Sequence, residues 1–251
     1  MLTEHYRILT GGRIYLNIDH LLNKIDALEL ASLCSDLIRF ETVNPPGNEL
    51  AAAEYIFDYL RRAGFEGEII PAGEGRGSVL AHFKGTGERK GLAFSGHIDV
   101  VPVGAEKWQH DPFGGQLEDG KVWGRGAADM KSGLASMLVS ARLLAASGLP
   151  LRGDLVFAAT AGEEVDMMGA SSLASHPNMG ELQAIVISEP TLNMLGLAER
   201  GVFWPEFSTY GQTAHGSTPE LGRNAITMMI TLLTEFENLS VPYTAHPVLG
   251  H

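Results

Sequence analysis

The sequence is poor in cysteine. Its 251 residues contain a single one, Cys34, so an intramolecular disulfide is excluded and a reducing compartment, the cytoplasm, is the simpler expectation. Cys34 lies in an apolar periodic stretch, where it is expected to be a small buried side chain.

Long apolar runs and an excess of basic charge are also missing. No stretch approaches the 18 or so apolar residues of a membrane span, and the N-terminal region lacks the basic start and apolar core of a signal peptide. Lys and Arg number 18 against 30 Asp and Glu, a net charge of −12. This balance argues against nucleic acid or an anionic membrane as a partner.

What the sequence contains is an alternation of apolar strands and amphipathic helices. Hydrophobic residues make up 45% of the chain, enough for a substantial core. Residues 1–17 have no sustained period and are expected to form an extension with at most a short strand. The remaining pattern predicts helices at 28–38 (capped by Asp19 or Asn23), 49–63 (capped by Asn48), 132–147 and 169–175, strands at 68–71, 78–83, 92–101, 154–160 and 184–188, and a hairpin at 117–122. Because the later strands are continuously apolar, we expect an α/β fold with a mostly parallel central sheet and helices on both faces.

Polar side chains gather where these strands end. If 92–101 is one strand, His97 and Asp99 point the same way at its C-terminal end, as a metal ligand and the carboxylate that orients it. Taken alone, such a pair is more often a surface hydrogen bond. Asp129, Glu164 and Glu189 follow at intervals of 32, 35 and 25 residues, each suited to a βαβ-scale unit.

These residues predict a divalent metal site. Clustered carboxylates repel one another unless a cation lies among them, and imidazole with carboxylates suits zinc, cobalt or manganese better than calcium. Asp129 is placed centrally enough to bridge two metal ions about 3.5–4 Å apart. Glu163, beside Glu164, has two interpretations. It is a general base next to a metal ligand, or both acids simply lie at the start of a helix, where the helix dipole favours negative charge.

Four ordered motifs carry a family resemblance: SGHIDVVP at 95–102, GRGAADMK at 124–131, TAGEE at 160–164 and SEPT at 188–191. Together they resemble the acetylornithine deacetylase, succinyl-diaminopimelate desuccinylase and aminoacylase family of co-catalytic zinc metallohydrolases, over roughly residue 28 to the C-terminus. The resemblance implies a zinc-exopeptidase-like fold and hydrolysis of N-acyl amino acids or small peptides, in the manner of a deacetylase, desuccinylase, aminoacylase or carboxypeptidase. It also implies a cis peptide bond after Asp129.

The resemblance assigns roles to individual residues and implies two divalent metal ions. One metal takes His97, Asp129 and Glu189, and the other takes Asp129 and Glu164. Glu163 is then the general acid and base, and Asp99 supports His97.

Residues 210–226 (YGQTAHGSTPELGRNAI) resemble the family's lid or dimerisation domain. In that domain the residue matching His215 reaches a partner subunit's active site and stabilises the oxyanion, which implies a homodimer. We therefore expect a catalytic domain at 1–199 and part of a lid domain at 200–251. Pro205 is unusual in the strand-like run 202–210, because proline cannot donate to a sheet ladder.

The chain departs from the family at its C-terminal end. Members continue past the lid and return to the catalytic domain, where a late histidine completes the second metal site. His246 and His251 lie in lid sequence and lack the context of that ligand. We therefore expect a C-terminally truncated chain with an incomplete second site, exposed apolar surface and unpaired strand edges. The alternative is a catalytically incompetent metal-binding or dimerisation fragment. The acyl group and amino acid stay open.

Overall fold

The computed structural model describes residues 6–9, 13–16, 18–196, 198–199, 201 and 203–250. The chain divides into two compact units, Met1–Asn193 and Met194–His251, and each is described by itself. The predicted domains, 1–199 and 200–251, divide the chain close to this point. Their roles as catalytic and lid domains stay a prediction.

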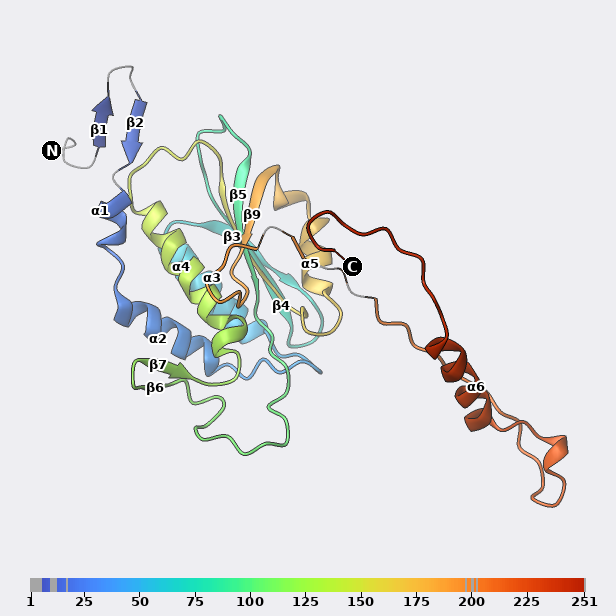
Figure 1. Ribbon diagram of the computed structural model, residues 1–251. Coiled ribbons are helices and arrows are strands. Elements are labelled where there is room, and N and C mark those ends of the chain that lie inside the picture. Colours follow the sequence, from blue (N-terminus) through green and yellow to red (C-terminus); the bar gives the residue numbers. More distant parts are fainter. Residues whose placement is uncertain are drawn as a thin grey trace. The chain divides into compact units, whose positions relative to one another are not determined.

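A five-stranded mixed sheet forms the centre of the first unit (Figure 1). Its strands lie in the order β3 (Glu66–Pro71), β4 (Gly77–Phe83), β8 (Leu155–Thr160), β5 (Gly91–His97) and β9 (Leu182–Ile187). Strand β4 is antiparallel to both β3 and β8, whereas β5 is parallel to β8 and to β9. Four strands therefore share one direction and β4 alone is reversed, which confirms the expected mostly parallel sheet.

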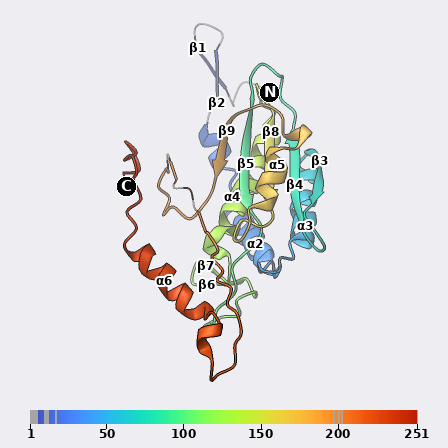
Figure 2. The same cartoon turned by 90° about the vertical axis from the view of Figure 1, so that its right-hand side faces the viewer.

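Helices cover both faces of this sheet, as expected. Helices α2 (Ala27–Ile38), α3 (Leu50–Arg62) and α4 (Ser132–Ala145) lie on one face, and α5 (Met168–Ala174) lies on the other (Figures 1 and 2). Strand β8 is buried along its whole length because its alternating side chains enter both cores. Phe157 and its neighbours two residues away pack toward α2–α4, whereas Val156 and Ala158 pack with Leu173 of α5.

Two hairpins form two-stranded sheets of their own. Strands β6 (Gln116–Glu118) and β7 (Lys121–Trp123) form the hairpin predicted at 117–122. Near the N-terminus, β1 (Tyr6–Leu9) pairs with β2 (Arg13–Leu16), where at most one short strand was expected.

Several predicted element ends were wrong. Strand β5 ends at His97, so Asp99 lies beyond it. The cap of α2 is Asp26, whose side chain accepts the N–H of Leu28 at 2.8 Å, because Ile18–Leu22 forms a separate helix, α1, that contains Asp19. Helix α3 begins after Glu49 rather than Asn48, and no side chain caps it.

The second unit contains a 3₁₀ turn, η3 (Pro219–Leu221), and helix α6 (Ala225–Glu237), which Asn224 caps through the N–H of Ile226. The strand expected at 202–210 is absent from residues 203–210, and residue 202 lies outside the described part of the chain. Pro205 has no N–H for a ladder, and the isolated bridge between Gln212 and Arg223 lies beyond this run.

Strand β9 is an edge of the sheet with apolar side chains open to solvent. Ile185, Val186 and Ile187 are all exposed. This confirms the expectation of exposed apolar surface along a strand edge. Among the described residues, no helix combines the length and the apolar character needed to cross a membrane.

Candidate metal centre

Strand direction places the candidate ligands at one edge of the sheet. Strands β5, β8 and β9 are parallel, so their C-terminal ends meet there, where ligands bind in such sheets. His97 is the last residue of β5, Glu163 and Glu164 follow β8, and Glu189 follows β9.

Asp129 reaches this edge from a distorted turn. Residues Ala127–Lys131 form a π-helical turn, η1, ahead of α4, and the backbone is non-helical at Asp129 (φ −120°, ψ 99°) and at Met130. The Asp129 carboxylate is 55% exposed, whereas Met130 is fully buried. Its Sδ accepts the backbone N–H of His97 at 3.1 Å. The Asp129–Met130 peptide bond is cis, as the resemblance predicted.

The imidazole of His97 lies at the centre of the acidic groups. Its Nε2 is 3.1 Å from Asp129 Oδ1, 3.7 Å from Glu189 Oε1 and 4.0 Å from Glu163 Oε2. One ligand atom from each of His97, Asp129 and Glu164 can be chosen so that all three lie within 4.8 Å of one another. Side chains from four separate segments therefore converge on one small volume.

Asp99 lies beside the other ring nitrogen of His97, with both its backbone carbonyl and its carboxylate near that nitrogen. The other ring nitrogen of His97, Nδ1, is 2.9 Å from the backbone carbonyl of Asp99 and 3.6 Å from its carboxylate. A carbonyl can only accept, so Nδ1 carries a proton and Nε2 is the nitrogen free for a metal.

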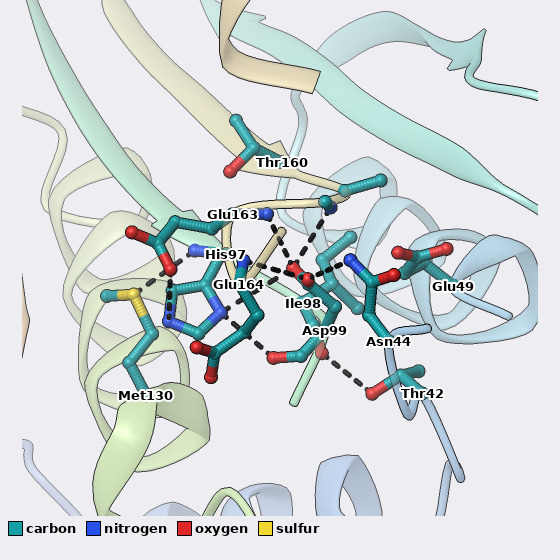
Figure 3. A network of polar contacts seen from close by, with 12 residues as sticks. Thr42, Asn44, Glu49, His97, Ile98, Asp99, Met130, Thr160, Glu163 and Glu164 are labelled. Carbon is teal, nitrogen blue, oxygen red and sulfur yellow. Dashed lines mark hydrogen bonds and ion pairs between the residues drawn. The ribbon is translucent and has the colours of Figure 1, made fainter. Parts of the chain in front are cut away.

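The fully buried carboxylate of Asp99 also holds the turn after β8. It accepts the backbone N–H groups of Gly162, Glu163 and Glu164 at 3.0, 3.0 and 3.1 Å, and the side-chain amide of Asn44 at 2.8 Å (Figure 3). Because β5 ends at His97, the chain turns and Asp99 fixes the segment that carries Glu163 and Glu164.

Charges around the site shift the pKa values of its central pair in opposite directions. Burial lowers the pKa of His97, but Asp99, Glu189 and Glu163 outweigh burial and raise it to about 9. Burial raises the pKa of Asp99, but the nearby His97 imidazole and the hydrogen bonds from Asn44 and the Glu164 backbone prevail and bring it to about 2. At neutral pH the metal-free site therefore holds a buried imidazolium against a carboxylate.

The remaining acids repel one another. Burial, followed by the charges of Asp129 and Glu163, raises the pKa of Glu189 to about 7 although His97 opposes the shift. Burial and the same neighbours raise the pKa of Glu164. A proton or a cation must therefore compensate this cluster.

His215, the remaining predicted site residue, lies in the second unit. It is exposed, and its Nδ1 is 2.8 Å from Ser217 Oγ and accepts the Ser217 N–H at 3.2 Å. The described part of that unit places His246 in a local turn, where it accepts N–H groups of Val248 and Leu249. His251 lies outside the described residues. The roles assigned to all these residues stay predictions.

Sequence reasoning missed Asn44. The sequence analysis gives Asn44 no role, and its contact with Asp99 spans 55 positions. An asparagine followed by two prolines and a glycine is typical of a turn, and it does not indicate a partner.

Comparisons with known proteins agree with this geometry. Residues 93–244 match the protein family described as peptidase family M20/M25/M40. A probable succinyl-diaminopimelate desuccinylase of Staphylococcus epidermidis is 32% identical over 206 residues, which cover 82% of this chain and 50% of the relative. A succinyl-diaminopimelate desuccinylase of Cereibacter sphaeroides is 33% identical over 216 residues, covering 82% and 56%. The chain thus spans about half the length of the curated relatives it matches.

The fold also resembles solved structures. Human carnosine dipeptidase 1 superposes with a TM-score of 0.62 at 18% identity, covering 90% of this chain and 56% of that one. This likeness concerns the fold alone. The family match extends over more than half of the chain and confirms the resemblance seen in the four motifs. The chain therefore belongs to the peptidase family M20/M25/M40.

Proposed function

We propose that the complete protein is a metal-dependent hydrolase that cleaves the amide bond of an N-acyl amino acid or a small peptide. The observation that carries this proposal is the convergence of His97, Asp129 and Glu164 within 4.8 Å of one another at the ligand-binding edge of the sheet. Family membership supports the reaction class.

The donor set fits a divalent cation. One buried imidazole faces carboxylates, and burial together with repulsion from neighbouring acids raises the pKa of Glu164 and Glu189; a cation relieves that repulsion. His97, Asp129 and Glu189 would hold one ion, and Asp129 with Glu164 a second. Zinc is the first candidate for this mixed nitrogen and oxygen set, followed by cobalt and manganese.

A metal bound there supplies a Lewis acid and lowers the pKa of water. Glu163 would act as the general base and acid: it takes a proton from the attacking water and returns it to the leaving nitrogen as a C–O bond forms and the C–N bond breaks. Two observations support this role. Its carboxylate is 39% exposed and so open to substrate, and it lies 4.0 Å from His97 Nε2, beside the ligands.

The second unit would be part of a lid and dimerisation domain. In this proposal His215 reaches the active site of a partner subunit and stabilises the oxyanion that develops on the carbonyl. A homodimer, a small N-acyl amino acid or peptide as substrate, and the cytoplasm as compartment complete the proposal. The single cysteine supports a reducing environment.

A second function is open to the 251-residue chain on its own: metal binding without turnover. Among the described residues, the cluster at the sheet edge contains one imidazole, that of His97. A second ion held by Asp129 and Glu164 alone would bind weakly, because it lacks a nitrogen ligand.

One experiment separates these possibilities. We would measure the metal content and the hydrolysis of a panel of N-acyl amino acids and dipeptides. Both measurements are made for this chain and for a version extended to the length of its relatives. The Glu163→Gln variant of each is the control for hydrolysis at this site. Hydrolysis by the longer version that Glu163→Gln abolishes supports the enzyme. Metal binding without hydrolysis in both versions favours the binding module, and neither metal nor hydrolysis contradicts both.

A further inference from the structure

A buried ion pair lies behind the turn that carries Glu163 and Glu164. Arg76, in the connection between β3 and β4, donates from Nε to Glu49 Oε2 at 2.9 Å and from Nη2 to Glu49 Oε1 at 2.7 Å. The Glu49 side chain is fully buried and that of Arg76 is 12% exposed. None of the steps proposed for the reaction uses either residue.

The guanidinium of Arg76 packs against two glycines that flank the Asp99 network. A Cβ added to Gly47 would lie 2.3 Å from Arg76 Nε, and one added to Gly162 would lie 3.0 Å from Arg76 Nη2. Both glycines have positive φ values, 91° and 83°. A side chain at either position would therefore displace the guanidinium and strain the backbone.

Electrostatic contacts show the same placement. The hydrogen bonds to Glu49 raise the pKa of Arg76 against the effect of burial, and the charges of Asp166 and Asp99 add to the rise. Asp166 closes the turn, since its N–H donates to the carbonyl of Gly162 at 3.1 Å. Arg76 is therefore near both ends of the turn 162–166.

The turn is thus held from two sides. Asp99 accepts its three N–H groups from one side, together with the amide of Asn44, and Arg76 fills the other side. Figure 3 shows Glu49 beside Asn44, next to this network. A planar guanidinium held by two parallel hydrogen bonds has a fixed orientation, which a lysine ammonium does not reproduce.

We propose that Arg76, fixed by Glu49, is a positioning residue that braces the turn 162–166 and thereby sets the places of Glu163 and Glu164 at the metal centre. The pair acts through the turn and touches neither substrate nor metal. Burial of an ion pair is an inefficient source of stability, so a positioning role accounts better for its location than stabilisation alone. The assignment of Glu164 as a ligand rests on the proposed function, whereas the bracing of the turn does not.

Hydrogen exchange in the metal-free chain tests the bracing directly. Arg76→Lys keeps the positive charge but loses the paired hydrogen bonds of the guanidinium to Glu49. It is expected to increase the exchange rate of the backbone amides of Gly162, Glu163 and Glu164 about tenfold. The control is Arg142→Lys: Arg142 forms a more exposed pair with Glu29, at 2.6 Å, on the helical face of the unit. This control should leave exchange at 162–166 unchanged.

An unchanged rate at 162–166 in Arg76→Lys, or an equal increase in Arg142→Lys, would overturn the proposal. Should Arg76→Lys fail to fold, Glu49→Gln serves instead, because its amide oxygen still accepts one of the two hydrogen bonds. This milder change must give the same localised increase, and its absence counts against the bracing in the same way.

Zinc titration then tests the consequence for the site. Arg76→Lys is expected to weaken zinc binding about 10–100-fold, as changes in the partners of metal ligands typically do, while Arg142→Lys has no effect. Unchanged zinc affinity in Arg76→Lys would show that the pair does not set the place of Glu164. If the unsubstituted chain binds no zinc, the proposed function fails, and the exchange rates still decide whether Arg76 braces the turn.

Discussion

Raising the pH of the metal-free chain from 6.5 to 8 is expected to lower its free energy of unfolding. The reason is that folded His97 holds a proton that the unfolded chain releases: burial lowers its pKa, but Asp99, Glu189 and Glu163 raise it from 6.5 to about 9. A group whose pKa is raised by folding stabilises the fold fully below its unfolded pKa. That stabilisation is lost as the pH rises through the folded pKa, here between 6.5 and 9.

The size of the loss follows from the two pKa values of His97. Their difference corresponds to about 3 kcal/mol once the full window is crossed, and to about 1.5 kcal/mol between pH 6.5 and 8. The range stops at pH 8 because burial lowers the pKa of Lys131 from 10.5 to about 8, so that Lys131 adds stability above this pH. Folding also raises the pKa of Glu189, from 4.5 to about 7. Its contribution to stability is therefore lost as the pH rises, as for His97, but chiefly below pH 7.

Urea denaturation with a chelator present, at pH 6.5 and pH 8, measures the effect. The unsubstituted chain should lose about 1.5 kcal/mol more than His97→Gln between these pH values. His215→Gln, which removes an exposed histidine from the other unit, should behave like the unsubstituted chain. With zinc added the trend should reverse, because zinc competes with the proton on His97. Equal pH dependence in the unsubstituted chain and His97→Gln would refute the reasoning.

Three further predictions concern the site. In a version extended to the length of its relatives, Glu163→Gln should abolish turnover with metal content nearly unchanged, whereas Glu164→Gln should lower metal content. Kinetics measures the turnover and elemental analysis the metal content, and an exchange of the two outcomes would contradict the assigned roles. His215→Ala should bind metal normally and lose about 2.7–4 kcal/mol of transition-state stabilisation, measured as kcat/KM, and a verified heterodimer of Glu163→Ala and His215→Ala subunits should recover activity. Asp99→Asn, which places an amide among N–H donors, should increase exchange at Gly162; unchanged exchange would exclude Asp99 as the anchor of the turn.

The sheet and its site-bearing edge could be predicted because burial leaves a direct signal in the sequence. Strand β8 is buried on both faces, so its sequence is a continuous apolar run. The acids that follow such a run must therefore lie at the strand's end. The same logic placed His97, Glu164 and Glu189. Asp129 was placed with them as a strand-end residue, but it lies in a π-helical turn before α4, which nothing in local propensity predicts.

Contacts between distant segments could not be predicted. Asp99 was expected to orient His97, and its carboxylate lies 3.6 Å from His97 Nδ1, but nothing in the sequence showed that the same carboxylate also binds the turn 63–65 residues further along the chain. The pair of Glu49 and Arg76 joins a helix start to a turn 27 positions away. A single sequence carries helix and strand periods, and it does not record which polar groups meet once the elements pack.

In the proposed function, His97, Asp129, Glu164 and Glu189 together hold divalent metal at the C-terminal edge of the sheet. A crystal structure of the zinc-loaded chain, with anomalous diffraction recorded on both sides of the zinc absorption edge, tests it most directly. We predict an anomalous peak about 2.0–2.2 Å from both His97 Nε2 and an Asp129 carboxylate oxygen. Zinc bound elsewhere, with these side chains left without a peak between them, would contradict the account.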